Sequence, residues 1–424
     1  MNREKVWVEL FRKYDILNKV RANGFFSIST EQMKEFGEPR LLVSSDEYSG
    51  LPKIFKENKL SIIAVGRKQF LIGDFKLYKG VEIEEKMETK TYEPINLESL
   101  KISDLFNESS SILYAFHASM LQDAFDRNDL ALTMYGKMGA GDFSFEVDSQ
   151  SPNGGGEKHR IKVSRPQIEI DAGFESDEEV FIIEAKNRRV DEINLRQLYY
   201  PYRVWSSKVD KHIVPVFFIY TDSTFYIFKC EFMVPNNINS LVIVDKKKYV
   251  LADEPITMED IIGIHKSSRP TMKIGVPFPQ ADKMEKILEL LDLLDANELS
   301  TTLEDIAEHF QFDRRQADYY SNAAKFLGYS DKKRGHVILT ERGKRLLEMK
   351  YKEKHLDILK SMFEDVVIHK AFKQVIENGT LPRQMVTEWL SNTYFRGGAP
   401  ETPSRRSGTV VGWINWAIRI SNDE

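Results

Sequence analysis

The stretch QIEIDAGFESDEEVFIIEAKNRRV, residues 167–190, decides how the middle of this chain folds. Apolar and β-branched residues on both sides of a polar turn at 175–179 predict two strands. Side chains alternate between the two faces of a strand, so Glu184 and Lys186 share one face of the second strand. This apolar strand becomes charged at its C-terminal end, where its side chains can meet Asp171 from the first strand.

Two carboxylates on neighbouring strands suit Mg²⁺, which prefers oxygen ligands and keeps several waters. We expect Asp171 and Glu184 to bind this metal, with the carbonyl of Ala185 as a further ligand. The metal would lower the pKa of a bound water and offset charge on the phosphorane. Lys186 would orient that water and stabilise the developing charge. The pattern therefore predicts phosphodiester hydrolysis, with a surface ion pair at a strand end as the alternative.

The elements around this stretch alternate between helix and strand. Apolar residues at three- and four-residue steps predict the helices, and β-branched and aromatic runs predict the strands. Strands followed by a helix and then by another strand predict a mixed sheet flanked by helices. The expected order is a helix at 109–127, strands at 142–147, 160–172 and 180–185, a helix at 191–208, and strands at 213–220 and 224–232.

Asp171, a short gap and the triplet Glu184-Ala185-Lys186 on the next strand resemble the PD-(D/E)XK nuclease superfamily, as found in type II restriction endonucleases. The order of elements over 101–265 also resembles the core of that family. Ile170 stands where the motif usually has proline. The resemblance implies a site-specific deoxyribonuclease in which Asp171, Glu184 and Lys186 are catalytic, with Mg²⁺ as the cofactor and Mn²⁺ as its substitute.

Two further residues match positions of this family. Glu108, at the start of the first core helix, resembles an acid that often joins the metal site, and the alternative is an acid that complements the helix dipole. Gln197 resembles a glutamine of the RecB-like branch, but Pro201 stands where that branch has tyrosine. We therefore expect Gln197 to lie on the helix surface.

The resemblance also implies partners. These are double-stranded DNA, a second copy of the chain and a companion DNA methyltransferase. The second copy is expected because two DNA strands need two active sites. One alternative is a repair or recombination nuclease that acts on DNA junctions or ends. Another is a non-catalytic winged-helix DNA-binding regulator, against which the intact Asp171, Glu184 and Lys186 argue.

Several regions outside the catalytic stretch are candidates for DNA contact. A glycine-rich loop at 133–147 carries Lys137, and glycine permits close backbone approach to a phosphate; a flexible surface loop is the alternative. Residues 283–350 resemble a winged helix, with a recognition helix at 313–328 capped by Asp313 and a hairpin wing at 330–340. A protein-interaction or dimerisation module is the alternative there. The expected DNA contacts of this region are Arg314, Arg315, Gln316, Tyr319, Lys332, Lys333 and Arg334.

Near the C-terminus, we expect apolar-periodic helices at 381–391 and 407–420. Arg405 and Arg406 precede the last helix and are candidates for phosphate contact, with a solvated loop as the alternative. Trp413 and Trp416 are expected to pack in the core rather than to stack on bases.

The whole chain is expected to be an α/β (α+β) multidomain protein with a central mixed β-sheet flanked by helices. The net charge of −5 is mild evidence against a nucleic-acid binder, although local charge on one face matters more. One cysteine excludes disulfide frameworks within the chain. There is no membrane-length apolar run, and the N-terminus is charged, so we expect a cytoplasmic protein without a membrane partner. The expected domains are a small α+β domain for DNA recognition (1–100), the nuclease domain (101–265), a linker (266–281), the winged helix (282–350) and a mainly helical domain (351–424).

Overall fold

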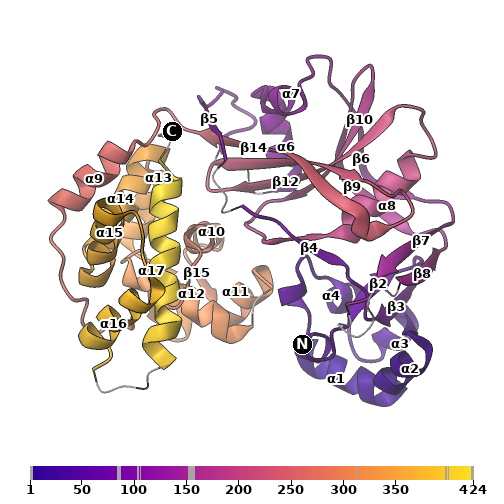
Figure 1. The fold of residues 1–424 in the computed structure, drawn as a ribbon, viewed down its shortest axis with the longest axis horizontal. Helices are drawn as coiled ribbons and strands as arrows, with labels where there is room; N and C mark the ends of the chain where they lie inside the picture. Colours follow the sequence, from indigo (N-terminus) through magenta and orange to yellow (C-terminus); the bar gives the residue numbers. More distant parts are fainter. Residues whose placement is uncertain are drawn as a thin grey trace. The chain divides into compact units, whose positions relative to one another are not determined.

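The computed structural model describes residues 3–83, 87–102, 105, 107–150, 158–311, 313–396, 399 and 401–421. The chain divides into two compact units, which are coloured along the sequence in Figure 1. The first unit comprises Met1–Met87, Leu97–Tyr220 and Phe225–Lys248, and the second comprises Glu88–Asn96, Thr221–Thr224 and Tyr249–Glu424. The main division therefore falls near residue 248, earlier than the boundary at 265 that the sequence suggests.

The first unit begins with a small α+β body, as expected. Helix α1 (Arg3–Tyr14) is amphipathic, and its Trp7 packs edge-on against Phe55 with ring centroids 4.7 Å apart. Strands β1 and β2 both pair antiparallel with β3. The remaining elements are α2 (Ile16–Asn23), β1 (Phe25–Ser29), α3 (Thr30–Lys34), α4 (Pro39–Val43), α5 (Lys53–Glu57), β2 (Ser61–Ala64), β3 (Gln69–Gly73) and β4 (Tyr78–Gly80).

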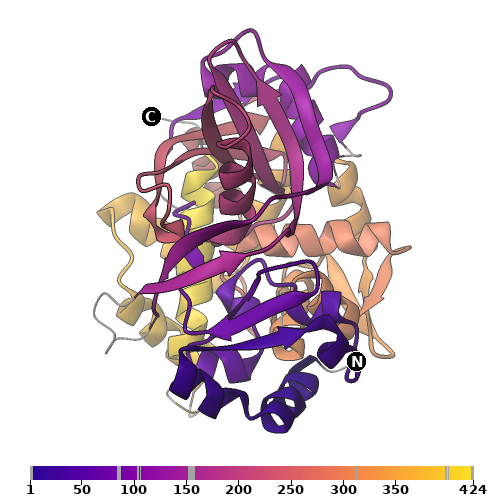
Figure 2. The same cartoon turned by 90° about the vertical axis from the view of Figure 1, so that its right-hand side faces the viewer.

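A seven-stranded mixed sheet forms the centre of the fold, and its strands twist strongly in Figure 2. Its order is β5-β14-β13-β12-β10-β9-β6, in which β10 runs parallel to β12 and antiparallel to β9. The predicted mixed sheet flanked by helices is thereby confirmed. The strands are β5 (Thr89–Tyr92), β6 (Ala131–Gly139), β9 (Gln167–Glu175), β10 (Glu179–Lys186), β12 (His212–Thr221), β13 (Thr224–Phe232) and β14 (Leu241–Leu251), with the pairs β7 (Phe143–Asp148) and β8 (Lys158–Val163), and β11 (Glu192–Asn194) and β4, beside the sheet.

Helices pack on this sheet through aromatic side chains. Phe125 of α7 (Met120–Phe125) stacks on Phe181 with centroids 4.1 Å apart, and α8 (Leu195–Trp205) places Tyr199 against Phe232. The single helix expected at 109–127 is interrupted at Ser119, whose φ of 62° is incompatible with a continuous helix, so α6 (Glu108–His117) and α7 are separate.

The second unit is mainly helical. Trp413 and Trp416 are buried in its core, which confirms the sequence expectation. Its elements after β14 are α9 (Met258–Ser267), α10 (Met284–Ala296), β15 (Ser300–Thr302), α11 (Leu303–His309), α12 (Arg314–Phe326), β16 (Ser330–Lys333), β17 (His336–Leu339), α13 (Glu341–Glu348), α14 (Tyr351–Phe363), α15 (Val366–Asn378), α16 (Arg383–Thr393) and α17 (Glu401–Arg419).

Two features of the second unit differ from expectation. The stretch 266–281, expected to be a linker, is irregular but packed, because Phe278 and Ala281 are buried in the core of the unit. The last helix begins at Glu401, so Arg405 and Arg406 lie within α17 rather than before it. Within the described residues, none of the helices has the length and apolar character needed to cross a membrane.

Candidate active site

The predicted catalytic residues lie where the pairing of β9 with β10 ends. The last paired residues are Ile183 and Ala172, so Glu184 and Asp171 occupy the next position along the two strands. There the backbone N–H of Ala185 donates to Oδ2 of Asp171 at 2.7 Å, and this carboxylate replaces a strand carbonyl as the acceptor. Both predicted metal ligands therefore lie where the pairing of these two interior strands ends.

Lys186 is the cation of this site. Its Nζ lies 2.6 Å from Oε1 of Glu184, 3.6 Å from Oδ1 of Asp46 and 3.9 Å from Oε1 of Glu108. Burial alone would lower the pKa of Lys186, but the carboxylates of Glu184, Asp46 and Glu108 outweigh burial and raise it. Lys186 is thus held as an ammonium ion. We call Lys186 and the carboxylates of Asp171, Glu184, Glu108 and Asp46 the Lys186 cluster.

Three carboxylates of the Lys186 cluster have raised pKa values and therefore resist ionisation. Burial, followed by the charge of Glu108, raises the pKa of Asp171 to about 6. Burial also raises the pKa of Glu184 to about 7, because the attraction of Lys186 only partly offsets burial and repulsion from Asp171. For Glu108 at the start of α6, burial and its acidic neighbours raise the pKa as well. The site therefore holds more negative charge than Lys186 alone can compensate.

Gln197 contacts the same cluster. Asn194 caps α8 by accepting from the N–H of Arg196, and this start of the helix directs Gln197 to Glu184. The Nε2 of Gln197 donates to Oε1 of Glu184 at 2.5 Å. The surface role expected for Gln197 is therefore wrong, and its resemblance to a family glutamine was the useful signal.

Asp46 is the member of the cluster that the sequence does not predict. Burial opposes its ionisation, but the charges of Lys186 and Arg188 hold the pKa of Asp46 below its usual value. Arg188 donates from Nη2 to Oδ2 of Asp46 at 2.6 Å. Asp46 comes from the small N-terminal body, and no local pattern around it signals a distant partner.

The chemistry of the donors fits a Mg²⁺ site of low protein coordination. Among the described residues, no group of three or more His, Cys, Asp and Glu side chains has the arrangement of a complete metal cage. Mg²⁺, however, is usually held by one or two carboxylates together with water and substrate phosphates. Asp171 and Glu184 meet that requirement, and a dication would offset the repulsion that raises their pKa values.

Lys137 lies on strand β6 rather than in the expected loop. Strand β6 is at one edge of the large sheet and pairs with β9, where Lys137 is opposite Glu169. The Nζ of Lys137 is 3.6 Å from Oε1 of Glu169, and both side chains are largely exposed. Pairing with β9 orders this segment despite its glycines.

The basic residues at the start of α12 have local partners. Arg314 Nε lies 2.6 Å from Oε1 of Glu304, and Arg315 Nε donates to the hydroxyl of Tyr319 at 2.5 Å. Gln316 forms a capping box with Asp313, which confirms Asp313 as the helix cap. Arg314 and Arg315 remain exposed at this end of the helix.

In the hairpin of β16 and β17, one basic residue is bonded to α12 and two are exposed. Lys332 donates to Oδ1 of Asp318 at 2.6 Å and to Oδ1 of Asn322 at 2.7 Å, so it is engaged with α12. Lys333 and Arg334 are exposed at the turn, where Arg334 has a φ of 51°. Within α17, Arg406 donates to the carbonyl of Phe278, whereas Arg405 is exposed.

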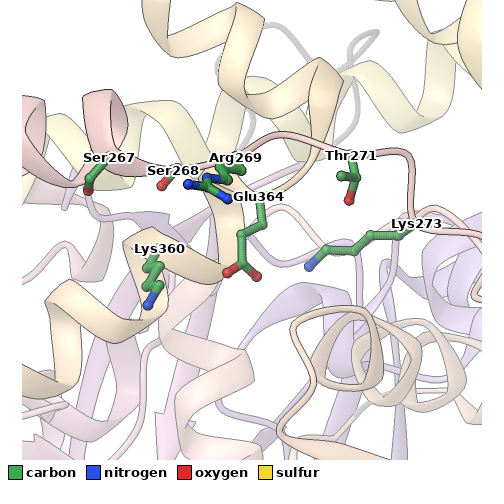
Figure 3. A pocket seen from close by; sticks show the side chains of 7 residues that line it. All are labelled: Ser267, Ser268, Arg269, Thr271, Lys273, Lys360 and Glu364. Atoms are coloured by element: carbon green, nitrogen blue, oxygen red, sulfur yellow. The ribbon is translucent and has the colours of Figure 1, made fainter.

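The second unit also contains an open pocket of about 400 Å³, shown in Figure 3. Its lining mixes both signs of charge, with Glu364 among the cations Arg269, Lys273 and Lys360. The ammonium of Lys273 already donates to the carbonyls of Phe326 and Ser361. This pocket therefore lacks the paired carboxylates that a Mg²⁺ site of the proposed kind requires.

Three family models match consecutive parts of the chain. Each is described as a domain of unknown function: DUF6996 over residues 4–72, DUF6997 over 73–250 and DUF7226 over 286–422. No curated protein and no solved structure matches the chain. Asp171, Glu184, Lys186 and Gln197 lie in the second matched segment, whereas Asp46 lies in the first.

Proposed function

We propose that this chain is a Mg²⁺-dependent endonuclease that cuts double-stranded DNA, of the type II restriction kind. The observation that carries the proposal is the Lys186 cluster at the end of β9 and β10. Asp171 and Glu184, both with raised pKa values, lie beside one ammonium group at 2.6 Å from Glu184. A surface ion pair would need neither the burial nor the surplus of carboxylates.

In this proposal Asp171 and Glu184 hold Mg²⁺, and Glu108 adds negative charge beside them. The bound metal would supply a water of lowered pKa and offset charge at phosphorus. Lys186, as an ammonium, donates a hydrogen bond to the attacking oxygen or to a phosphate oxygen and stabilises the negative charge that develops. The raised pKa of Lys186 favours its protonated form, so hydrogen-bond donation is the role that we assign to it. Gln197 holds Glu184 in its orientation.

The second unit supports a DNA-reading role. Its order of helix, strand, two helices and hairpin, from α10 to β17, with the sheet order β15-β17-β16, supports the proposed winged-helix assignment. In this assignment α12 enters the major groove, with Arg314, Arg315 and Gln316 at its start and Tyr319 one turn on. Lys333 and Arg334 at the turn of the hairpin would contact phosphate.

The test is cleavage of long unmethylated DNA by the purified protein, with Mg²⁺ and with chelator, followed by sequencing of the ends. Discrete fragments with a common end sequence in Mg²⁺ alone are expected. Mn²⁺ is expected to replace Mg²⁺. The Asp171→Asn variant is the matched control, since asparagine can still accept from Ala185, and it is expected to leave the DNA intact.

Other outcomes would redirect the proposal. Smeared products, or cutting confined to junctions and ends, would favour a repair or recombination nuclease. Binding without cutting would favour a DNA-binding regulator. A restriction role further implies a companion methyltransferase, so DNA methylated by that enzyme is expected to resist cleavage.

A further inference from the structure

A short segment of the N-terminal body, residues 45–48, is fastened to the chain that follows strand β10. The backbone N–H groups of Asp191 and Tyr48 donate across this contact, to Oε1 of Glu47 at 2.7 Å and to Oε2 of Glu192 at 2.6 Å. Asn194 donates from Nδ2 to the carbonyl of Ser45 at 3.0 Å. The segment 45–48 is thus held at several points directly beyond the catalytic strand.

Asp46 lies within this segment and connects two cations. One of its oxygens, Oδ2, accepts from Nη2 of Arg188 at 2.6 Å, and the other, Oδ1, lies 3.6 Å from Nζ of Lys186. Arg188 is largely buried, with 12% of its side chain exposed. Because Arg188 holds one oxygen, the second oxygen stays directed at Lys186.

The position of Lys186 depends on competing acceptors. Glu184 already binds the ammonium at 2.6 Å, through a carboxylate that the proposed metal also needs. Asp46 attracts the same ammonium from another side, and its carboxylate remains ionised beside Arg188. Asp46 therefore gives the ammonium a second anchor, which stays in place when the proposed metal occupies Glu184.

We propose that Asp46 is a positioning residue of the active site, which holds the ammonium of Lys186 between Glu184 and the N-terminal body. This inference rests on the proposed nuclease function. It makes the N-terminal body a structural part of the active site, so that Asp46 completes a cluster whose other members lie in the second matched segment.

The test compares Asp46→Asn with wild type in single-turnover cleavage at saturating protein and Mg²⁺. Asparagine keeps the size of the side chain and an acceptor for Arg188 but removes the charge that faces Lys186. We expect the cleavage rate to fall at least tenfold, with the DNA dissociation constant unchanged within threefold. Asp46→Glu, which restores the charge, is expected to recover part of the rate.

Glu47→Gln is the matched control, because Glu47 anchors the same segment through Asp191 but makes no contact with Lys186 that the structure records. It is expected to lower the melting temperature and keep the rate within twofold. If Asp46→Asn cleaved DNA at the wild-type rate, or if Glu47→Gln lost as much of the cleavage rate, the positioning role would be overturned. The proposed nuclease function would not be affected by either result. Absence of cleavage by the wild type itself would overturn the proposed function, and this inference with it.

Discussion

Lys186 is proposed to act in cleavage but not in DNA binding, and one substitution can test this. It supplies the only ammonium that the structure records beside Glu184, and it lies at the strand end rather than on an exposed basic surface. We predict that Lys186→Ala lowers single-turnover cleavage by about 100-fold or more, the usual loss for one charge-stabilising donor. The DNA dissociation constant, measured by fluorescence anisotropy, is expected to stay within a few-fold.

Lys211→Ala is the control for that substitution. Lys211 pairs at 2.6 Å with Glu175, the last residue of strand β9, so it is also a lysine in an ion pair with a carboxylate of the sheet, but it lies outside the Lys186 cluster. Its replacement is expected to leave cleavage unchanged. A substantially active Lys186→Ala variant would remove this lysine from the mechanism.

The raised pKa of Asp171 predicts how stability depends on pH without metal. In the unfolded chain this carboxyl ionises near pH 4, but in the fold only near 6. The folded state therefore binds the proton more tightly than the unfolded chain does. Ionisation of Asp171 lowers the free energy of unfolding as the pH rises between these two values, and the loss persists at higher pH. The free energy of unfolding of Asp171→Asn, which avoids this cost, is expected to rise relative to that of wild type by about 2 kcal/mol as the pH rises from 4 to 7.

The measurement is the thermal unfolding midpoint of both proteins in chelator across that pH range. Adding Mg²⁺ at pH 7.5 is expected to raise the midpoint of wild type and not that of Asp171→Asn, because a ligand that binds only the folded state stabilises it. An equal rise in both proteins would show that Mg²⁺ binds elsewhere.

The sequence predicts the part of the site that lies on two consecutive strands. Asp171, Glu184 and Lys186 are brought together by alternation and one tight turn, which are local properties. Asp46 depends on how the N-terminal body packs on residues 188–194, and such a contact leaves no periodic signal. Gln197 is intermediate between these predictable and unpredictable residues. The sequence predicts its helix, but helix geometry alone does not show that the start of this helix faces Glu184.

At the scale of elements, expectation failed mainly where backbone conformation or charge breaks a pattern. The strand expected at 160–172 is two strands, because Arg165 has a φ of 43° and is followed by Pro166. Strand β14 was not predicted, since the charged run 245–248 interrupts its apolar ends. Most other helices and strands in the core lie within a few residues of their predicted positions because their periodicity is strong.

Helix α17 packs closely on the segment 281–283, and this contact requires glycine at one position. A Cβ at Gly412 would lie 2.3 Å from the carbonyl oxygen of Asp282, while Trp413 donates to the carbonyl of Ala281 at 2.8 Å. We predict that Gly412→Ala destabilises the second unit by about 1–3 kcal/mol, the usual cost of overpacking. Differential scanning calorimetry measures the effect.

Gly408 in the same helix is the matched control. A Cβ there would meet Arg383 at 3.5 Å, an ordinary contact with the end of a flexible side chain. Gly408→Ala is expected to be neutral or stabilising by up to about 1 kcal/mol, because alanine favours helix. Equal effects of the two substitutions would contradict the close approach of α17 to Asp282.

The hairpin of β16 and β17 allows a test of the winged-helix assignment. Lys333 is exposed, whereas its neighbour Lys332 is engaged with Asp318 and Asn322. We predict that Lys333→Ala weakens DNA binding several-fold and lowers the salt dependence by about one phosphate contact. Lys332→Ala is expected to lower the melting temperature instead. Unchanged DNA binding in Lys333→Ala would favour a protein-interaction role for this hairpin.

At the scale of the whole molecule, a net charge of −5 has to be reconciled with DNA as the proposed substrate. The Lys186 cluster contributes four carboxylates against one lysine, so part of the negative charge belongs to the proposed metal site. The exposed cations Arg315, Lys333 and Arg334 lie instead on α12 and the adjoining hairpin. Local charge, rather than the total, governs attraction to a phosphate backbone.

One Lys186 cluster per chain predicts one cut strand per copy, so cleavage of both strands requires two copies. Wild type co-expressed with an excess of Lys186→Ala is then expected to form mixed dimers that convert supercoiled plasmid to nicked circles, as measured on agarose gels. The same proteins mixed immediately before the assay form few mixed dimers and serve as the control. The alternative result is that the linear product falls only in proportion to the share of wild type, with no gain of nicked circles after co-expression. That result would show that each copy cuts both strands on its own.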